Sequence, residues 1–331
     1  MEIPEWNPGK LTEVSGSYWM GCTLHAGVRL DVFTIIGNDV LSAEEITQKI
    51  NGDPRAVDML LNALVAMGLL EKKENRFSNT TASSTFLSKD SPKYTGYIIK
   101  HHSHLVESWS QLVQAVLEGK PQRSRTSFGD EEIRESFLMG MFNMATKIAP
   151  EIVELIDLKD RHHLLDLGGG PGTYAIHFCM KNPRLKATVY DLATTRPFAE
   201  KTIAQFNLTD RIDFQAGDYV DQGVEGQYDV AWLSHILHGE GPEDCHRIVR
   251  KAASALEPGG MIIIHEFILD NSMDKPLFPA LFSLNMLLGT ESGQAYSEQQ
   301  LRNMLSDAGA GNIERLPYTG PTESGIIMGI V

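Results

Sequence analysis

The chain has 331 residues, a length that suits two domains, and its formal net charge is −14 at pH 7. Such an acidic balance disfavours binding to nucleic acid and to anionic membrane surfaces. The sequence contains no run of about 18 apolar residues, as a transmembrane helix needs, and it begins without the features of a signal peptide. We therefore expect a cytoplasmic protein whose three scattered cysteines are buried, reduced thiols.

The amino-terminal third has the pattern of a winged helix. Residues 42–45 (SAEE) form a capping box that starts one helix, a proline opens a second helix at 54–67, and residues 69–77 predict a short pair of strands. This order leaves a cofactor-sensing, DNA-binding regulator as an alternative function. However, residues 39–78 are net negative and the second helix is mostly apolar, which favours burial, in part against another subunit, over contact with DNA.

A helical region follows at residues 94–158. Methionine and phenylalanine side chains gather between residues 137 and 144. Core packing explains most of them, although methionines also adapt well to flat ligands.

Residues 164–174 (LLDLGGGPGTY) are the most informative stretch of the chain. An apolar run containing Asp166 leads into four glycines and a proline, which is typical of a buried strand that feeds a tight loop and then a helix. Gly168 and Gly170 fit the start of a dinucleotide fingerprint, but Thr173 stands at its third glycine. The loop therefore predicts a nucleotide-like cofactor, and its spacing weakens the case for hydride transfer.

Further strands and helices alternate downstream of this loop. We expect strands at 187–191, 211–218, 228–234 and 259–264, and helices at 197–206 and 242–256. Because strands alternate with helices, we predict an α/β fold with a doubly wound parallel sheet. Ligands of such sheets bind outside the carboxyl ends of the strands, where Asp191, Asp218 and Ser234 lie.

These motifs resemble those of class I S-adenosylmethionine-dependent methyltransferases. The whole chain is similar to the small-molecule O-methyltransferases that include the acetylserotonin, hydroxyneurosporene and plant caffeate-type enzymes. The matching motifs are LLDLGGGPG, VYDL, GDY, LSHILH, ALEPGG and HEFIL, in the family's order over roughly residues 15–331. The resemblance implies a winged-helix dimerisation domain at 1–98, a helical linker that roofs the active site at 99–158, and a Rossmann-like catalytic domain at 159–331.

The resemblance also implies the ligands and the residues that bind them. S-adenosylmethionine would be the cofactor and S-adenosylhomocysteine the product, the acceptor a small molecule, and the protein a homodimer. Carried over by position, Gly168 and its neighbours would approach the methionine part of the cofactor. Asp191 would bind the ribose hydroxyls, and Asp218 and Tyr219 would frame the adenine. The expected cofactor-binding residues are therefore Asp166, Gly168, Gly170, Asp191, Asp218, Tyr219 and Ser234.

Two residues are implied as catalytic, namely His238 as general base and Glu266 as the carboxylate that orients it. Methyl transfer brings nucleophile and methyl together in line, and a hydroxyl is a poor nucleophile until a base, for which histidine is suited near neutrality, removes its proton. The chain departs from the family at Gly239, where relatives commonly have aspartate, and at Ala295, where plant members have a second glutamate. The base could therefore be less tightly oriented, and a C- or S-methyltransferase that works mainly by proximity is an alternative.

The remaining site predictions concern metal and acceptor. His235 lies three residues before His238, and if that segment is helical both could share one face, which makes a metal site an alternative. However, no third ligand of regular spacing lies nearby. We therefore expect no metal and a solvated or capping His235. An orienting hydrogen bond from Asn285 is expected in an otherwise apolar acceptor pocket. The predicted pocket walls are Met141, Phe142, Met144, Phe282, Asn285 and Met286.

Overall fold

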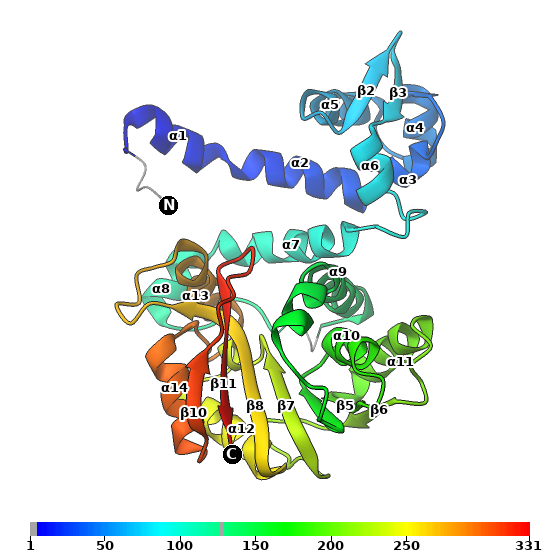
Figure 1. Cartoon of the computed structure of the whole chain (residues 1–331). Helices are drawn as coiled ribbons and strands as arrows, with labels where there is room; N and C mark the ends of the chain where they lie inside the picture. Colours follow the sequence, from blue (N-terminus) through cyan, green and yellow to red (C-terminus); the bar gives the residue numbers. More distant parts are fainter. Residues whose placement is uncertain (1–4, 126–128) are drawn as a thin grey trace. The chain divides into compact units, whose positions relative to one another are not determined.

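The computed structural model describes residues 5–125 and 129–331, and the chain divides after Leu105 into two compact units (Figure 1). The elements that begin in the first unit are α1 (Pro8–Gly16), α2 (Tyr18–Arg29), α3 (Val32–Ile36), β1 (Leu41–Ser42), α4 (Ala43–Ile50), α5 (Pro54–Ala66), β2 (Leu70–Lys73), β3 (Arg76–Asn79), α6 (Thr81–Phe86) and α7 (Gly96–Trp109). Helix α7 continues past the division into the second unit.

The expected winged-helix elements are present in the first unit. Ser42 and Glu45 make both hydrogen bonds of the capping box at the start of α4, and Asp53 caps α5. Strands β2 and β3 form the antiparallel wing, and β1 pairs with β3. Helix α5 buries Leu61 and Leu64 completely in the core of this unit. The helix that would read DNA therefore uses its apolar face for packing.

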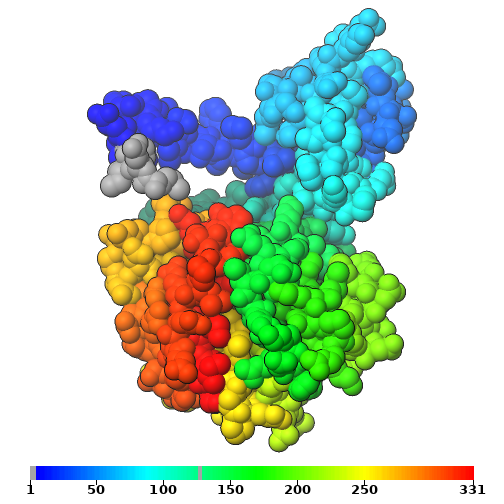
Figure 2. Space-filling view, in the orientation of Figure 1, coloured from blue at the N-terminus to red at the C-terminus, as the bar shows by residue number. Residues whose placement is uncertain are grey.

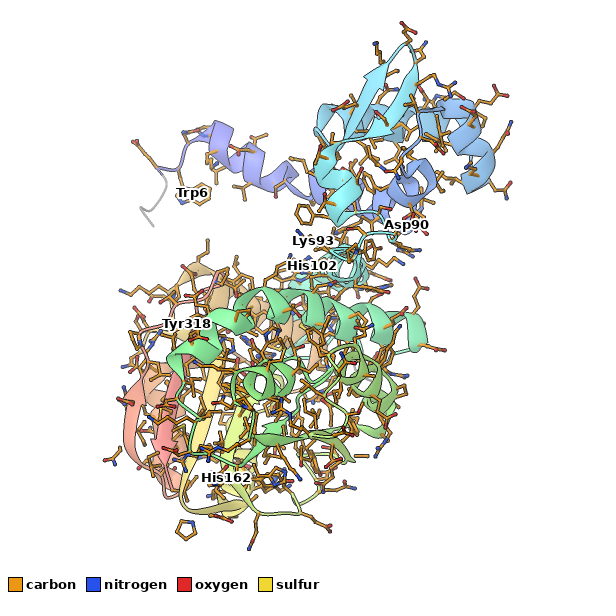
Figure 3. All side chains as sticks on the ribbon, turned by 45° about the vertical axis from the view of Figure 1, so that its right-hand side comes forward. Trp6, Asp90, Lys93, His102, His162 and Tyr318 are labelled. Atoms are coloured by element: carbon orange, nitrogen blue, oxygen red, sulfur yellow. The ribbon has the colours of Figure 1, made fainter. Side chains whose placement is uncertain are left out.

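The first two helices expose large apolar side chains. No residue of α1 is buried, and Trp6, immediately before it, is 52% exposed (Figure 3). The other exposed apolar side chains here are Leu11, Val14, Tyr18, Trp19 and Met20. Exposed apolar side chains that gather in one segment in this way suggest a region of interaction.

The second unit holds a large sheet. Its elements up to the middle of the sheet are α8 (Leu112–Glu118), α9 (Glu131–Leu155), β4 (His163–Leu167), α10 (Thr173–Lys181), β5 (Lys186–Asp191), η2 (Ala193–Thr195), α11 (Arg196–Gln205), β6 (Ile212–Ala216) and β7 (Tyr228–Ser234). They are followed by η3 (Leu237–Gly239), α12 (Pro242–Ser254), β8 (Leu256–Leu269), α13 (Leu277–Gly289), β9 (Tyr296–Ser297), α14 (Glu298–Asp307), β10 (Gly311–Arg315) and β11 (Ser324–Ile330).

The sheet has the order β10-β11-β8-β7-β4-β5-β6, and β9 pairs with β8. Strands β4 to β8 are parallel, as predicted, whereas β10 and β11 add an antiparallel edge that the sequence reading did not include. Strand β4 lies between β5 and β7, so the strand order reverses at the strand that feeds the glycine loop. Such a switch point is where open α/β sheets bind their ligands.

Helices cover both faces of this sheet. Along β7, Val230 and Trp232 face the core beneath α9 to α11, while Ala231 and Leu233 face the core beneath α12 and α14. Figure 2 shows α14 and the last strands (orange and red) on one flank of this unit and α9 to α11 (green) on another. The carboxyl ends of the parallel strands are thus held between two packed layers.

Two expectations from composition concern thiols and membranes. The three cysteines are free thiols; Cys179 and Cys245 are buried as expected, but Cys22 is only half-buried. Among residues 5–125 and 129–331, no helix combines the length and apolar character that crossing a membrane requires.

Candidate active site

The glycine loop between β4 and α10 is shaped by backbone that only glycine adopts easily. Gly168, Gly170 and Gly172 have φ of +66°, +54° and +77°. A Cβ atom on Gly168 would lie 2.5 Å from Cγ2 of Ile236. The loop therefore needs glycine both for its turn and for close approach by the segment after β7.

Asp166 lies under this loop with one unused oxygen. Its Oδ2 accepts a hydrogen bond from the N–H of Ala175 (3.1 Å), while its buried Oδ1 has no partner among the described residues. Burial raises the pKa of Asp166 to about 7; the Ala175 hydrogen bond opposes this effect and the charge of Asp191 adds to it. A Cβ on Gly169 would lie 2.6 Å from Cγ of Asp166. An unsatisfied acceptor beneath a glycine cradle fits a cofactor that brings a donor or a positive charge.

Asp191, at the end of β5, is tied to the same loop. Its Oδ2 accepts from the N–H of Gly170 (2.8 Å), and its Oδ1 accepts from the N–H of Leu192 (2.7 Å) and the hydroxyl of Thr195 (2.9 Å). Burial raises the pKa of Asp191, and these hydrogen bonds oppose that rise. Asp191, which is predicted to bind the ribose, is therefore connected to the glycine loop by a hydrogen bond.

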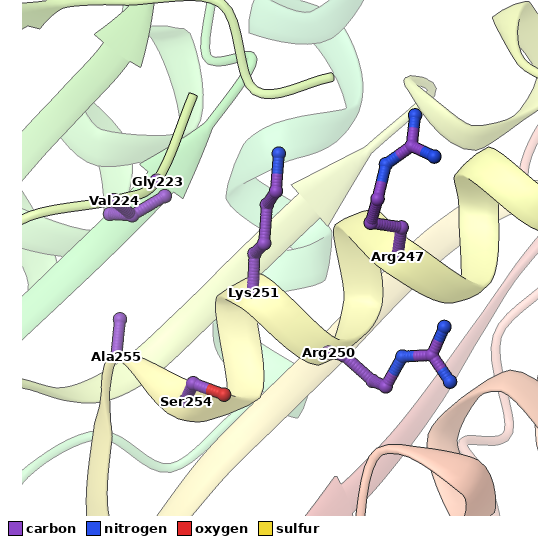
Figure 4. Close-up of a pocket in the computed structure, with 7 residues that line it drawn as sticks. All are labelled: Gly223, Val224, Arg247, Arg250, Lys251, Ser254 and Ala255. Carbon is purple, nitrogen blue, oxygen red and sulfur yellow. The ribbon is translucent and has the colours of Figure 1, made fainter. Parts of the chain in front are cut away.

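Asp218 and Tyr219 lie in the turn after β6. Asp218 accepts a hydrogen bond from the N–H of Val220 (2.9 Å), and Tyr219 packs close to Gly168. Lys251 of α12 donates to the carbonyl oxygens of Tyr219 (3.2 Å) and Val220 (2.6 Å) and so fixes the turn from outside. Lys251 also borders a surface pocket of about 310 Å³ (Figure 4), whose lining residues are Gly223, Val224, Arg247, Arg250, Lys251, Ser254 and Ala255.

Ser234, at the end of β7, is engaged within the protein. Its hydroxyl lies 3.0 Å from Nδ1 of His265, whose Nε2 lies 3.0 Å from the hydroxyl of Ser324. Burial holds the pKa of His265 well below its usual value, so this histidine stays neutral. Contact between Ser234 and the cofactor stays a prediction, and the sequence reading missed this buried network.

His238 and Glu266 are brought together as the resemblance implied. Nδ1 of His238 lies 2.8 Å from Oε2 of Glu266, while Oε1 accepts from the N–H groups of Leu237 (3.0 Å) and His238 (3.3 Å). The glutamate is only 2% exposed, and burial alone would raise its pKa. The interactions with His238 and His235 outweigh burial and hold the pKa of Glu266 well below its usual range. An ionised Glu266 keeps the proton of His238 on Nδ1 and leaves Nε2 as an acceptor.

His235 differs from its prediction. The short helix η3 begins at Leu237, after His235, and His235 has a φ of +56°, so the two histidines do not share a helix face. The His235 side chain is 24% exposed, but its Nδ1 is buried and lies 3.6 Å from Oε2 of Glu266. The ring is thus partly exposed, as a solvated histidine would be, but its Nδ1 is turned toward the buried carboxylate.

Aromatic rings surround the histidine pair. The ring of Phe282 meets that of His238 edge-on at 4.8 Å between centroids, and Phe267 lies 5.8 Å from His238 in a stacked arrangement. Phe278 lies 5.0 Å from Phe267. Of these three phenylalanines, only Phe282 is predicted from the sequence as a pocket wall. The spacing of four residues between Phe278 and Phe282 on one helix was the signal for the second ring.

The other predicted pocket residues are placed less uniformly. Asn285 uses its Oδ1 to accept from Nε1 of Trp109 (3.2 Å) and Nη2 of Arg123 (3.3 Å), so its oxygen is already engaged. Met286 is buried and Met141 half-buried. Phe142 and Met144 of α9 lie differently, since the ring of Phe142 packs against Phe206 (6.5 Å) and Met144 is exposed. The structure thus brings Phe282 to His238, and the roles of the rest stay predictions.

An ion pair fixes the segment that follows the base. Arg125 donates from Nη2 to Oε2 of Glu240 (2.8 Å) and to the carbonyl oxygen of Gly239 (2.7 Å), and its Nη1 donates to the other carboxylate oxygen. Glu240 is 4% exposed. The sequence shows Glu240 only as part of the departure His-Gly-Glu and does not indicate its partner.

Both parts of the chain match known families. Residues 109–310 match the family model of an O-methyltransferase domain, and residues 12–89 match that of an O-methyltransferase dimerisation domain. The first match covers more than half of the chain.

Three relatives align with nearly the whole chain. A 3-hydroxy-5-methyl-1-naphthoate 3-O-methyltransferase of Streptomyces sahachiroi is 30% identical over 98% of this chain and 95% of the relative. An L-tyrosine C(3)-methyltransferase of Streptomyces lavendulae is 27% identical over 92% of this chain and 88% of the relative. PigF of Serratia sp., an S-adenosyl-L-methionine-dependent methyl transferase, is 26% identical over 92% and 91%. The structure of PigF with SAH has a TM-score of 0.89, covering 98% of this chain and 100% of that chain.

The glycine loop, the free oxygen of Asp166 and the loop-bound Asp191 fit S-adenosylmethionine, the cofactor that the name of PigF gives. The assignment favours an enzyme over the alternative of a cofactor-sensing regulator. The chain belongs to the O-methyltransferase family and is an S-adenosylmethionine-dependent O-methyltransferase.

Proposed function

We propose that this enzyme methylates a hydroxyl group on a small, apolar, aromatic acceptor and that His238 is the general base. The observation that carries the proposal is the 2.8 Å contact between Nδ1 of His238 and Oε2 of the buried Glu266. A buried, ionised carboxylate on one ring nitrogen fixes the tautomer in which the other nitrogen accepts a proton.

When bound, the cofactor supplies an electrophilic methyl group to the acceptor oxygen. His238 takes the hydroxyl proton on Nε2, and Glu266 stabilises the imidazolium that forms. The proton then leaves to water, because the His238 side chain is 14% exposed. Phe267 and Phe282 would hold the acceptor ring and keep bulk water from the reacting oxygen.

The aromatic character of the acceptor rests on two supports. Phe267, Phe278 and Phe282 offer flat apolar surface beside the base, which suits stacking or edge contact with a ring. The naphthoate methyltransferase of S. sahachiroi, by its name, acts on a hydroxyl of a fused aromatic acid. A hydroxylated aromatic compound is therefore the acceptor class to test first.

We assign the cofactor-binding roles to the residues around the glycine loop. Asp191 would bind the ribose hydroxyls, and Asp218 with Tyr219 would frame the adenine. Asp166 and the loop glycines, with Ser234, would border the methionine part. The support is the shared position of these residues at the carboxyl ends of β4 to β7 and the direct link between Asp191 and Gly170.

A homodimer is the proposed assembly. The chain carries an O-methyltransferase dimerisation domain, and the exposed apolar side chains of α1 and α2 lie within or next to the matched residues. A second copy would remove these side chains from water. Sedimentation equilibrium should give twice the chain mass of 36.7 kDa, and a monomer at all concentrations would contradict this assignment.

The function is tested with methyl-labelled cofactor and a panel of phenols and hydroxynaphthoates. His238→Ala should lower turnover by about 10²–10⁴-fold, the usual contribution of a general base, with little change in affinity for S-adenosylhomocysteine. His246→Ala is the matched control, because His246 also pairs with an acid, Asp307, but does so on α12. Unchanged turnover in His238→Ala would refute the base role and favour catalysis by proximity.

Carbon methylation is the second candidate. The L-tyrosine C(3)-methyltransferase of S. lavendulae is 27% identical over 92% of the chain. Removal of a phenol proton also makes the neighbouring ring carbon more nucleophilic, so the same base would serve this reaction. NMR of the labelled product separates the two outcomes, since an oxygen-bound and a ring-bound methyl have different shifts.

A further inference from the structure

His235, His238 and Glu266 place three metal-ligating atoms in one small cluster. One ring nitrogen of each histidine and one carboxylate oxygen of Glu266 all lie within 4.8 Å of one another. Oε2 of Glu266 is 2.8 Å from Nδ1 of His238 and 3.6 Å from Nδ1 of His235. The two histidines come from the segment after β7 and the glutamate from β8, so the topology of the sheet assembles the cluster.

The proposed methyl transfer leaves His235 without an explanation. Its φ of +56° is unfavourable for a residue with a Cβ atom, and such strain is often kept where it serves a site. Its buried Nδ1 has no hydrogen-bond partner among the described residues, and 3.6 Å from Glu266 is too long for a hydrogen bond. The fold thus accepts an unfavourable backbone conformation at His235 that places its Nδ1 near the carboxylate of Glu266 and the imidazole of His238.

We propose that this cluster binds a divalent transition-metal ion, Zn²⁺ in the first place, as an inhibitor rather than a cofactor. Two imidazoles and a carboxylate suit zinc better than magnesium or calcium. In a tetrahedral zinc site the ligand atoms are about 3.4 Å apart, as follows from metal–ligand distances of about 2.0–2.2 Å. The two separations from Oε2 of Glu266, 2.8 Å and 3.6 Å, lie on either side of this value, and both histidine side chains are partly exposed.

Metal at this site would block the proposed base. A neutral histidine that coordinates through Nδ1 carries its proton on Nε2, so the Nδ1 proton of His238 would pass through solvent to Nε2. That nitrogen could no longer accept the acceptor's proton, and the metal would also neutralise Glu266. This inhibitory consequence rests on the proposed function, whereas metal binding itself does not.

The binding test is calorimetry of chelator-treated protein with Zn²⁺. His235→Asn removes the imidazole and keeps a residue that tolerates the left-handed backbone. Wild type and the control His246→Asn should show one tight site, which His235→Asn should weaken by about 100-fold or more, since even outer partners of a metal contribute about 10–100-fold. Co²⁺ should give wild type the visible spectrum of a tetrahedral site that His235→Asn lacks. Absence of a tight site in wild type, or equal affinity in His235→Asn, would overturn the proposal.

Turnover separates the site from its consequence. Zn²⁺ should inhibit wild type at concentrations that saturate the site, and His235→Asn should need about 100-fold more, in line with its weaker binding. Tight binding lost in His235→Asn but without inhibition of wild type would support the site and contradict the base role of His238. Thermal unfolding and affinity for S-adenosylhomocysteine report whether each variant is folded.

Discussion

Substituting Glu266 by glutamine tests the arrangement that holds the base. The two carboxylate oxygens accept hydrogen bonds on opposite sides, Oε1 from the N–H groups of Leu237 and His238, and Oε2 from Nδ1 of His238 and the N–H of Phe267. An amide has only one acceptor oxygen. Glu266→Gln must therefore point its NH₂ group at donors on one of the two sides.

The amide orientation that costs less free energy is the one that inactivates the base. If the NH₂ group takes the place of Oε1, the backbone N–H groups of Leu237 and His238 both lose their acceptor. If it takes the place of Oε2, only the backbone N–H group of Phe267 loses its acceptor. Each unpaired buried donor costs about 1–3 kcal/mol, so the second orientation is favoured. Its NH₂ group donates to Nδ1 of His238, which moves the proton of that ring to Nε2. Because Glu266 is 2% exposed, water does not offset this loss.

We therefore expect Glu266→Gln to lower kcat by about 10²–10⁴-fold, as when the orienting acid of a base–acid pair is neutralised. The unfolding free energy should fall by about 1–3 kcal/mol for the unpaired donor. Nitrogen-15 NMR of the histidine ring reports the tautomer directly and requires no acceptor. Wild-type turnover together with a protonated Nδ1 in this variant would refute the reasoning.

The same variant has a pH signature. The pKa of Glu266 is lowered in the folded state, so its ionisation contributes stability that is present above the ordinary value of 4.5 and is lost as pH falls through the folded value. Glu266→Gln lacks this contribution. The stability difference between wild type and variant should therefore shrink on acidification below pH 4.5, as measured by urea unfolding.

Three further predictions concern other parts of the site. Asp191→Ala should weaken binding of S-adenosylhomocysteine by roughly 10–100-fold in calorimetry, because a charged acceptor is lost, and unchanged affinity would contradict its ribose role. Burial raises the pKa of Asp166 from 3.8 to about 7, so the folded cofactor-free protein keeps a proton that the unfolded chain releases, and stability should fall as pH rises between these values. Asp166→Asn should flatten that slope in urea unfolding, and a slope equal to wild type would disprove the assignment. Arg125→Gln leaves the buried Glu240 without its charged donor and should cost about 1–3 kcal/mol in thermal unfolding, as for an unsatisfied buried acceptor, whereas Arg302→Gln, from a more exposed pair, should cost less than about 1 kcal/mol. Equal losses would contradict the role of burial.

The parallel part of the sheet could be predicted because each strand carries its own local signal. The apolar run before Gly168 predicts β4, and the alternation of strands and helices predicts the order of the units. Strands β10 and β11 were missed because β11 pairs antiparallel with β8 across a long stretch of sequence. Local periodicity does not indicate such a partner, although the apolar run at 324–330 is a weak signal of a strand.

The site was predicted where it follows linear motifs and missed where it depends on backbone direction or distant contacts. His238 and Glu266 stand in recognisable segments, and the structure brings them together. The position of the His235 ring depends on its own left-handed backbone between β7 and η3, for which histidine has only a weak preference. The contact of Arg125 with Glu240 joins residues 115 positions apart in the sequence.

The two departures from the family pattern have a common structural explanation. Ala295, where plant members have a second glutamate, is completely buried, and its N–H donates to the hydroxyl of Ser283 (3.1 Å). A Cβ atom on Gly293 would lie 2.4 Å from the carbonyl oxygen of His238. Gly293 thus packs closely against the backbone of His238. A carboxylate at position 295 would have to be buried two residues from this close contact, at a large desolvation cost.

The chain orients its base through the backbone instead. Glu266 accepts the N–H groups of Leu237 and His238 with one oxygen and the ring of His238 with the other, so the carboxylate fixes both the main chain and the side chain of the base. On the far side, Arg125 holds the carbonyl oxygen of Gly239, the residue that replaces the family's aspartate. Because Arg125 donates a hydrogen bond to the carbonyl oxygen of Gly239, this turn does not need an aspartate after the base to fix it. The two departures from the family pattern are therefore compatible with a firmly oriented base.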